Sequence, residues 1–219
     1  MNIGILGATG PAGRSLGARL ASVGYDTVIG SRSKYRAMEV RDQLLAEWPD
    51  FELSLDAGDN QTAAGASVVV VATPWDAAAQ TAESVSRELE GKVVICMANA
   101  LAKVGREFQP LVPPRGSVAA SVQAAVPRAH ISAALHHVPA RELGDLHEPV
   151  QSDVLICSDH PHATEVTAEI VAKIPGVRPL DAGELSNAAP IEAFAAVLLQ
   201  LNIRYKTRVA VRFTGLANE

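Results

Sequence analysis

Three glycines stand close together just after the first hydrophobic stretch of the chain. They are Gly7, Gly10 and Gly13 in the run Gly-Ala-Thr-Gly-Pro-Ala-Gly, which follows the apolar residues 2–6. A glycine-rich turn between a strand and a helix lets the backbone approach a pyrophosphate, and the positive end of the helix dipole then faces that anion. Pro11 has no amide hydrogen to donate, but it suits the first position of the helix. The residues of this predicted phosphate-binding turn are Gly7, Thr9, Gly10, Pro11, Ala12 and Gly13.

A second polar group follows the next hydrophobic run, where dinucleotide-binding proteins distinguish their two cofactors. Residues 26–29 lead into Gly30, Ser31 and Arg32. A site for NAD normally has an aspartate or glutamate there, which binds the ribose hydroxyls. This chain has no carboxylate at that position, and the Arg32 guanidinium, helped by the Ser31 hydroxyl and by Lys34 or Arg36, suits a 2′-phosphate instead. We therefore predict an NADP(H) site; the alternative is that Arg32, Lys34 and Arg36 only begin a solvated helix.

The elements that position these residues follow from the hydrophobic pattern. Strand-like runs alternate with helical stretches through the first half of the chain, which predicts an α/β fold with a doubly wound parallel sheet and helices on both faces. Four consecutive valines at residues 68–71 suit a central strand that is covered on both sides. In such sheets, ligands bind at the carboxyl ends of the strands. The predicted strands are residues 2–6, 26–29, 51–55, 68–72 and 92–96.

In the second half of the chain, the regular alternation of strand-like and helical segments is interrupted. A long connection with three prolines follows residue 96. Apolar side chains recur at helical spacing from Leu185 to Tyr205, which favours a helix that packs in the core or in a dimer. Cys96 and Cys157 lie in apolar segments, so we expect buried thiols. The other predicted elements are a helix at 117–126, strands at 130–135 and 153–157, a helix at 162–173 and an edge strand at 208–213.

The bulk composition narrows the classes of partner. The chain has 219 residues, a formal net charge of -5 and a pI of about 5.7, with its basic residues dispersed. This balance argues against nucleic acid and against an anionic membrane surface as partners. No apolar run approaches the ~20 residues of a membrane span, and no signal-peptide pattern precedes the first strand, so we expect a cytoplasmic protein.

Three further segments extend the pattern along the chain. They are Leu-His-His-Val-Pro-Ala at 135–140, Arg-Pro-Leu-Asp-Ala-Gly at 178–183 and Leu-Ser-Asn at 185–187. Together with the glycine turn and the Ser31–Arg32 pair, their order and spacing resemble the NADPH-dependent reductases of the deazaflavin coenzyme F-420 over nearly the whole chain. The resemblance implies a Rossmann-type NADP-binding domain at 1–128, a small C-terminal α/β annex at 129–219, and a homodimer.

The same resemblance implies a chemistry and a set of contacts. The chemistry is direct hydride transfer between NADP(H) and coenzyme F-420, in which the cofactors hold the reactivity and the protein stacks and aligns them. His136 is expected to make a polar contact as the catalytic residue; the alternative is a strand-end histidine bonded to the backbone. The implied contacts are Thr73, Pro74, Met97 and Ala98 to the nicotinamide side, and His136, Val138, Pro139 and Ala140 to the deazaflavin.

The last helix departs from the family pattern. Family members often have arginine and hydroxyl residues after the Ser186–Asn187 pair, which face the deazaflavin. The residues found instead are Ala188, Ala189, Ala193 and Ala195. This loss of donors keeps one alternative open, an NADPH-dependent reductase of a flavin or another small acceptor. A second alternative is a catalytically silent NADP-binding redox sensor, since the run at 7–13 also occurs in proteins that bind the dinucleotide and signal its state, although a sensor would not require the segment at 136–140.

Two other chemistries find little support in the sequence. His160 and His162 are spaced like metal ligands, but no third ligand is near them, and Asp159 with Pro161 suits a helix start better. None of the three tyrosines is followed four residues later by the lysine that a short-chain dehydrogenase needs. We therefore predict no metal site.

Overall fold

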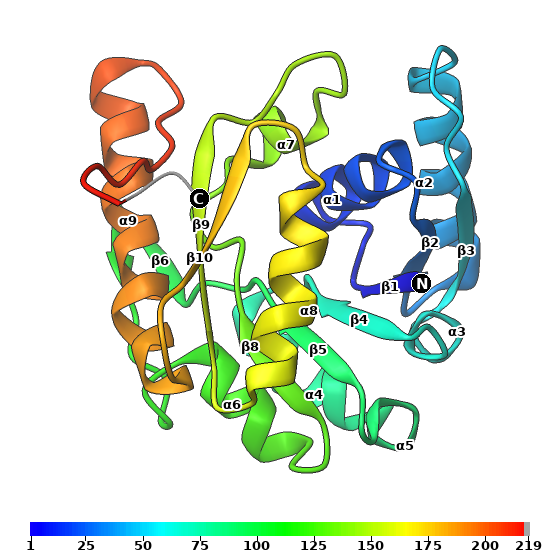
Figure 1. The fold of residues 1–219 in the computed structure, drawn as a ribbon, viewed down its shortest axis with the longest axis horizontal. Coiled ribbons are helices and arrows are strands. Elements are labelled where there is room, and N and C mark those ends of the chain that lie inside the picture. Colours follow the sequence, from blue (N-terminus) through cyan, green and yellow to red (C-terminus); the bar gives the residue numbers. More distant parts are fainter. Residues whose placement is uncertain (217–219) are drawn as a thin grey trace.

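One eight-stranded sheet forms the centre of the computed structural model, which describes residues 1–216 (Figure 1). Its strands are β1 (Asn2–Leu6), β2 (Asp26–Ser31), β3 (Leu55–Asp59), β4 (Val68–Val71), β5 (Val93–Cys96), β8 (His130–Ala133), β9 (Ser152–Ser158) and β10 (Val177–Asp181). Their order is β10-β9-β8-β5-β4-β1-β2-β3. All neighbours are parallel except β8 and β9, which are antiparallel. The predicted α/β class is confirmed.

Helices cover both faces of the sheet. The first face packs against α1, α2 and α8, and the second against α3 to α6 and the start of α9. Cys96 and Cys157 are free thiols buried in the second core, as predicted. No helix within residues 1–216 is long and apolar enough to cross a membrane. The helices are α1 (Pro11–Ser22), α2 (Lys34–Glu47), α3 (Asn60–Ala64), α4 (Trp75–Glu83), α5 (Ser86–Leu89), α6 (Val118–Ala125), α7 (Ala140–Gly144), α8 (Pro161–Ala172), the 3-10 turn η1 (Leu185–Asn187) and α9 (Ala188–Tyr205).

The third strand begins four residues later than the sequence predicts. The predicted run at 51–55 is wrong because the Phe51 ring packs edge-on against Trp48, with 5.9 Å between the ring centroids, and against His147. The strand that forms instead pairs Leu55 with Thr27 and ends at Asp59. Its sequence, Leu-Asp-Ala-Gly-Asp, lacks the apolar run that marks a covered strand, as befits the edge of the sheet.

The long connection after β5 contains an antiparallel hairpin that the sequence interpretation missed. Strand β6 (Leu101–Val104) pairs with β7 (Glu107–Pro110). Gly105 has a φ of +61°, which glycine adopts without strain at the first central position of a two-residue hairpin turn. The local signal was therefore present: a glycine between two short extended runs.

The C-terminal tail is not the edge strand predicted at 208–213. It has no regular strand structure, although the Val211 carbonyl accepts a 2.7 Å hydrogen bond from the Asp153 amide in β9. The buried Asp153 carboxylate also accepts hydrogen bonds from Arg178, Arg212 and the Phe213 amide. Burial alone would raise the pKa of Asp153, but these hydrogen bonds outweigh it and lower the pKa to about 2. The tail is thus held by a buried charge rather than by strand pairing.

Strands on both sides of residue 128 belong to the same sheet, since β5 pairs with β8 along its length. The division into parts at 1–128 and 129–219 stays a prediction.

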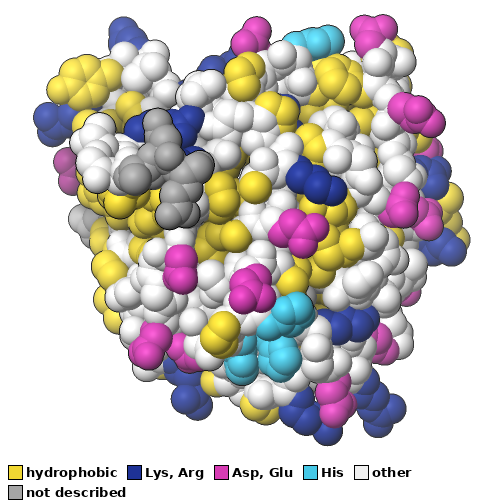
Figure 2. Space-filling view, in the orientation of Figure 1, with side chains coloured by type: hydrophobic (Ala, Val, Ile, Leu, Met, Phe, Trp, Pro, Cys, Tyr) yellow, Lys and Arg dark blue, Asp and Glu magenta, His cyan; other side chains and the backbone are white. Residues whose placement is uncertain are grey.

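On the face drawn in Figure 2, basic and acidic side chains of the described residues are interspersed.

Candidate functional site

The carboxyl ends of five neighbouring strands bring the predicted site residues to one edge of the sheet. Across this edge lie His136 after β8, Met97 after β5, Thr73 after β4, Gly7 after β1 and Ser31 at the end of β2. Four strand spacings of ~4.8 Å make this line ~19 Å long. An extended dinucleotide can therefore lie along the edge with its two ends over different strands.

A cavity of about 660 Å³ opens over β1, β2 and β4. Seven predicted cofactor residues line it: Gly7, Thr9, Gly10, Ser31, Arg32, Thr73 and Pro74. The sequence reasoning missed its other lining residues, which are Asn60, Ala72, Ala77, Gln80, Thr81 and Ser84. The last four lie on α4 or, for Ser84, cap its C-terminal end. Because α4 follows Thr73 and Pro74 directly, a pattern of small and polar residues after that strand was the available signal.

Two glycines of the turn are required by the fold itself. Gly7 has a φ of +73°, and a Cβ there would lie 2.5 Å from the Thr73 methyl carbon. The Gly7 amide donates to the Asn60 side-chain oxygen at 3.3 Å, which ties the turn to α3. A Cβ on Gly13 would lie 2.8 Å from the Ala8 Cα, so helix and turn pack too closely for a side chain.

Gly10 differs from both, because nothing in the protein forbids a side chain there. Its φ of -80° suits any residue, and the nearest atom to an ideal Cβ is the Gly7 carbonyl oxygen at 3.9 Å. Gly10 caps α1 without a side chain that could accept from the amides of Ala12 and Gly13. The amides of Ala12 and Gly13 thus have neither an acceptor within the helix nor a side-chain cap, which is the arrangement that binds a phosphate.

The charge of this cavity fits a phosphorylated ribose. Its lining contains one cation, Arg32, and no carboxylate. Arg32 is exposed and makes no ion pair within residues 1–216. Beside it, the Ser31 hydroxyl accepts a 3.3 Å hydrogen bond from the Ser33 amide, which leaves its own hydrogen free to donate. Lys34 is the first residue of α2 and lies outside the cavity lining.

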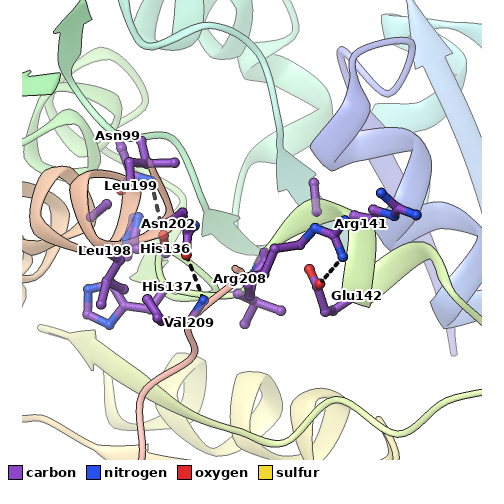
Figure 3. Close-up of a pocket in the computed structure, with 14 residues that line it drawn as sticks. Asn99, His136, His137, Arg141, Glu142, Leu198, Leu199, Asn202, Arg208 and Val209 are labelled. Atoms are coloured by element: carbon purple, nitrogen blue, oxygen red, sulfur yellow. Dashed lines mark hydrogen bonds and ion pairs between the residues drawn. The ribbon is translucent and has the colours of Figure 1, made fainter. Parts of the chain in front are cut away.

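A second cavity, of about 270 Å³, lies where β8 ends, between α7, α9 and the tail (Figure 3). All four residues predicted for the deazaflavin line it: His136, Val138, Pro139 and Ala140. An ion pair between Arg208 and Glu142, 2.9 Å long, joins the tail to α7 at its margin. The other lining residues are Asn99, His137, Arg141, Ala195, Leu198, Leu199, Asn202 and Val209.

Four residues of α9 line this cavity, and the sequence analysis interpreted the helical spacing of this segment only as packing in the core or in a dimer. Ala195, Leu198, Leu199 and Asn202 are spaced at i, i+3, i+4 and i+7, so they share one helix face. Of the four alanines where the family often has polar residues, only Ala195 lines the cavity.

His136 is buried and electrically neutral. Its side chain is 6% exposed, and burial, with a smaller effect of His137, lowers its pKa to about 3 against a weak opposing effect of the Met97 backbone. Neither ring nitrogen has a hydrogen bond of normal geometry within residues 1–216. Its carbonyl accepts a 3.1 Å hydrogen bond from the Asn99 amide. The preceding Leu135 has a φ of +66°, a strained conformation that aims the segment into the cavity.

Hydrogen bonds to α9 hold two walls of the second cavity. The His137 ring nitrogen lies 2.7 Å from the Ile191 carbonyl oxygen, and burial lowers the pKa of this histidine. The Val209 amide donates to the Asn202 side-chain oxygen at 2.6 Å. These two hydrogen bonds therefore connect the loop after β8 and the tail to α9, so that the three segments line the cavity as one unit.

Several predicted cofactor residues lie outside both linings. Met97 and Ala98 are nearly buried at the end of β5, the strand between the two cavities. The others are Pro11, Ala12, Gly13 and Lys34, of which the first three form the start of α1.

Residues that could support unrelated chemistry have other surroundings. His160 stacks on His130 with ring centroids 4.5 Å apart, and residues 1–216 contain no group of three side chains that could hold a metal ion. The Gly-x-Ser-x-Gly motif of the hydrolase nucleophile elbow occurs at residues 13–17. Ser15, however, lies inside α1 rather than on a strand-to-helix turn, so it is not placed as a nucleophile.

Comparisons with known proteins agree with this geometry. Residues 2–100 match the model of the family described as "NADP oxidoreductase coenzyme F420-dependent". An F420-dependent NADP reductase from Methanocaldococcus jannaschii is 33% identical over 99% of both chains, and one from Methanothermobacter marburgensis is 32% identical over 99% of both. A crystal structure from Arthrobacter sp. FB24 superposes with a TM-score of 0.82 at 21% identity, over 97% of this chain and 100% of that one, and shows the same fold.

Proposed function

Because the chain belongs to the family of F420-dependent NADP reductases, we propose that its two cavities hold NADP(H) and coenzyme F-420 for hydride transfer between them. When bound, the nicotinamide and the deazaflavin supply the redox chemistry. The observation that carries the proposal is the position of both cavities on one edge of the sheet, one over β1, β2 and β4 and the other where β8 ends.

On the NADP(H) side, each residue has a task that its surroundings support. The open space over Gly10 and the free amides of Ala12 and Gly13 receive the pyrophosphate. Arg32 and Ser31 bind the 2′-phosphate, because a guanidinium and a hydroxyl donate where an NAD site would have a carboxylate. Thr73, Pro74, Met97 and Ala98 lie further along the edge, toward the nicotinamide.

On the deazaflavin side, the protein aligns rather than exchanges protons. His136 with a pKa of about 3 stays neutral near pH 7, so it contributes shape and a polar contact, not acid or base catalysis. Pro139 stiffens the segment, and the Ala140 backbone offers an amide, whereas the predicted Val138 amide donates to the Leu135 carbonyl at 3.4 Å. Holding two rings in reactive contact accounts for ~7–11 kcal/mol of the barrier through orientation alone.

We further propose that the protein is a homodimer. Exposed apolar side chains on α9 support this: Phe194, Val197, Ile203 and Tyr205. Light scattering after gel filtration tests it, since a monomer at micromolar concentration would contradict the proposal. A cytoplasmic location and the division at residue 128 remain expectations from the sequence.

A turnover assay with two acceptors tests the proposed function. The purified protein is mixed with NADPH and oxidised F-420, then with FMN, and the loss of each chromophore is followed. Turnover of F-420 is expected. Turnover of FMN alone would favour a reductase of another acceptor, to which the alanines of α9 point, and tight NADPH binding without any turnover would favour a redox sensor.

Arg32→Ala tests the 2′-phosphate contact separately. Loss of a hydrogen bond to a charged group costs ~1.5–3 kcal/mol, so NADPH binding should weaken by ~10- to 150-fold while NADH binding changes little. Arg36→Ala is the matched comparison: Arg36 is exposed on α2, pairs with Glu39 at 2.6 Å and lies outside the cavity lining, so its loss should weaken NADPH binding much less. Equal losses for NADPH and NADH in the Arg32 variant would contradict the assignment.

A further inference from the structure

Arg19 is a buried arginine that makes no ion pair with a carboxylate in the described part of the chain, residues 1–216. It lies in the last turn of α1 and is only 1% exposed. Its guanidinium donates to backbone carbonyls alone: to Leu143 at 2.9 Å, to Glu142 at 3.3 Å, to Glu148 at 3.0 Å, and to Asp145. One side chain thus binds four carbonyls of a single short segment.

That segment is α7 and the loop after it. A helix of five residues cannot hold its shape alone, and the last carbonyls of any helix lack partners within it. Arg19 supplies those partners from another element, as a cationic cap on the C-terminal end of α7. The position of α7 is therefore set from α1.

The two helices also pack closely at Gly144, where α7 has no side chain and the Ser15 side chain of α1 fills the space. An ideal Cβ on Gly144, the last residue of α7, would lie 2.6 Å from the Ser15 hydroxyl oxygen and 3.1 Å from the Ser15 Cβ. Figure 1 shows α7 beside α1, and the two make one of the most extensive helix contacts in the protein. Arg19 and Gly144 together fix both the direction and the distance of this contact.

Each helix begins at one of the two cavities. α1 starts at Pro11, directly after the turn at Gly10, and α7 starts at Ala140, directly after Val138 and Pro139. We propose that Arg19 is a positioning residue that sets the deazaflavin segment relative to the NADP(H) turn, and hence the distance over which the hydride moves. This inference rests on the proposed function, because the two cavities must hold the two cofactors.

The choice of arginine supports the proposal. Burying a cation costs free energy, and a methionine would fill the same space without that cost. A methionine, however, would leave the Leu143 and Glu148 carbonyls without a donor within residues 1–216, and the other two carbonyls with only 3.4 Å bonds from backbone amides. Lysine, as a compact point charge, lacks the planar fork that reaches several acceptors at once.

The test measures hydride transfer separately from binding. In Arg19→Lys and Arg19→Met, the NADPH dissociation constant should stay within about twofold of wild type, because the turn at Gly10 is untouched. Single-turnover reduction of F-420 should slow by at least about tenfold, since hydride transfer depends steeply on alignment. The isotope effect on kcat with NADPH deuterated at nicotinamide C4 should rise as hydride transfer becomes rate-limiting.

A second variant acts on the distance and leaves the arginine in place. Gly144→Ala pushes α7 away from α1 and should also slow single-turnover transfer and raise the isotope effect. Ser15→Gly in the same chain removes the side chain that the new methyl group meets, so the double variant should recover part of the rate. A wild-type isotope effect in Gly144→Ala would instead show that the new methyl group only destabilises the protein.

Two controls separate positioning from loss of folded protein or of charge. Leu89→Ala removes a buried side chain of α5 in the second core, away from α1 and α7, and Arg128→Met removes an exposed cation that pairs with Glu90. Both should keep the wild-type isotope effect. An unchanged isotope effect in the Arg19 and Gly144 variants, with wild type active on F-420, overturns this inference alone; a wild type inactive on F-420 overturns the proposed function.

Discussion

Gly10→Ala separates what the fold needs from what the nucleotide needs. The added methyl group would lie 3.9 Å from the nearest protein atom, in a backbone conformation that alanine adopts freely. Replacing glycine by alanine where no strain arises stabilises a protein by ~0.4–1 kcal/mol, because the unfolded chain loses freedom. Gly10 is also the N-cap of α1, where alanine is less favourable than glycine by ~0.5–1 kcal/mol, so the two effects nearly cancel. The melting temperature of the ligand-free protein should therefore stay within ~2 °C of wild type.

The same methyl group stands where the pyrophosphate approaches the helix. We expect the NADPH dissociation constant to rise at least tenfold, a loss of ~1.4 kcal/mol or more. The stabilisation by added NADPH in a thermal melt should shrink accordingly. Binding is measured by fluorescence titration, and stability by thermal unfolding with and without NADPH.

Gly13→Ala is the matched comparison within the same turn. There the methyl group would lie 2.8 Å from the Ala8 Cα and 3.1 Å from the Ala72 Cβ, so overpacking should cost ~1–3 kcal/mol and lower the melting temperature. The reasoning would be refuted if Gly10→Ala bound NADPH like wild type, since the space over this glycine would then not hold the dinucleotide. It would equally be refuted if Gly10→Ala melted lower than Gly13→Ala.

Three further predictions follow from the ionisable groups. His136→Gln should lower the rate but keep the shape of the kcat/KM profile between about pH 5 and 8, because a histidine with a pKa of about 3 does not titrate there; a midpoint near pH 6–7 that vanishes in the variant would be contrary evidence. Asp153 has a folded pKa of about 2, below its ordinary 3.8, so it stabilises the protein above about pH 4 and this stabilisation is lost as the pH falls toward 2. Asp153→Asn should therefore cost ~2 kcal/mol at pH 7 in denaturant unfolding and far less near pH 2, and an equal cost at both pH values would contradict this. Burial raises the pKa of Glu192 to about 7 although the Val118 and Ala119 amides donate to it, so the folded state holds a proton that the unfolded state releases between about pH 4.5 and 7. Wild type should lose stability across that range as the pH rises, and melting curves of Glu192→Gln should show a smaller fall; parallel curves would argue against it.

The sequence interpretation succeeded where the signal is local. The turn at Gly7 and the Ser31–Arg32 pair belong to a strand–turn–helix pattern that is complete within ~30 residues. The strands of the parallel sheet carry apolar runs because both of their faces are covered. The predicted position of the edge strand β3 was wrong for the converse reason, because its partly exposed residues carry no such apolar run.

The amino-acid sequence by itself determined the fold class, and it placed the glycine turn and the Ser31–Arg32 pair of the proposed NADP(H) site at the ends of two strands. Only the tertiary structure decided which distant side chains meet: Asn60 holds Gly7 across 53 positions, and Arg19 reaches Leu143 across 124. Backbone conformation and hydrophobic period are properties of neighbouring residues, and a sequence displays them directly. A buried hydrogen bond between remote elements depends on how whole helices pack, so no local pattern announces it.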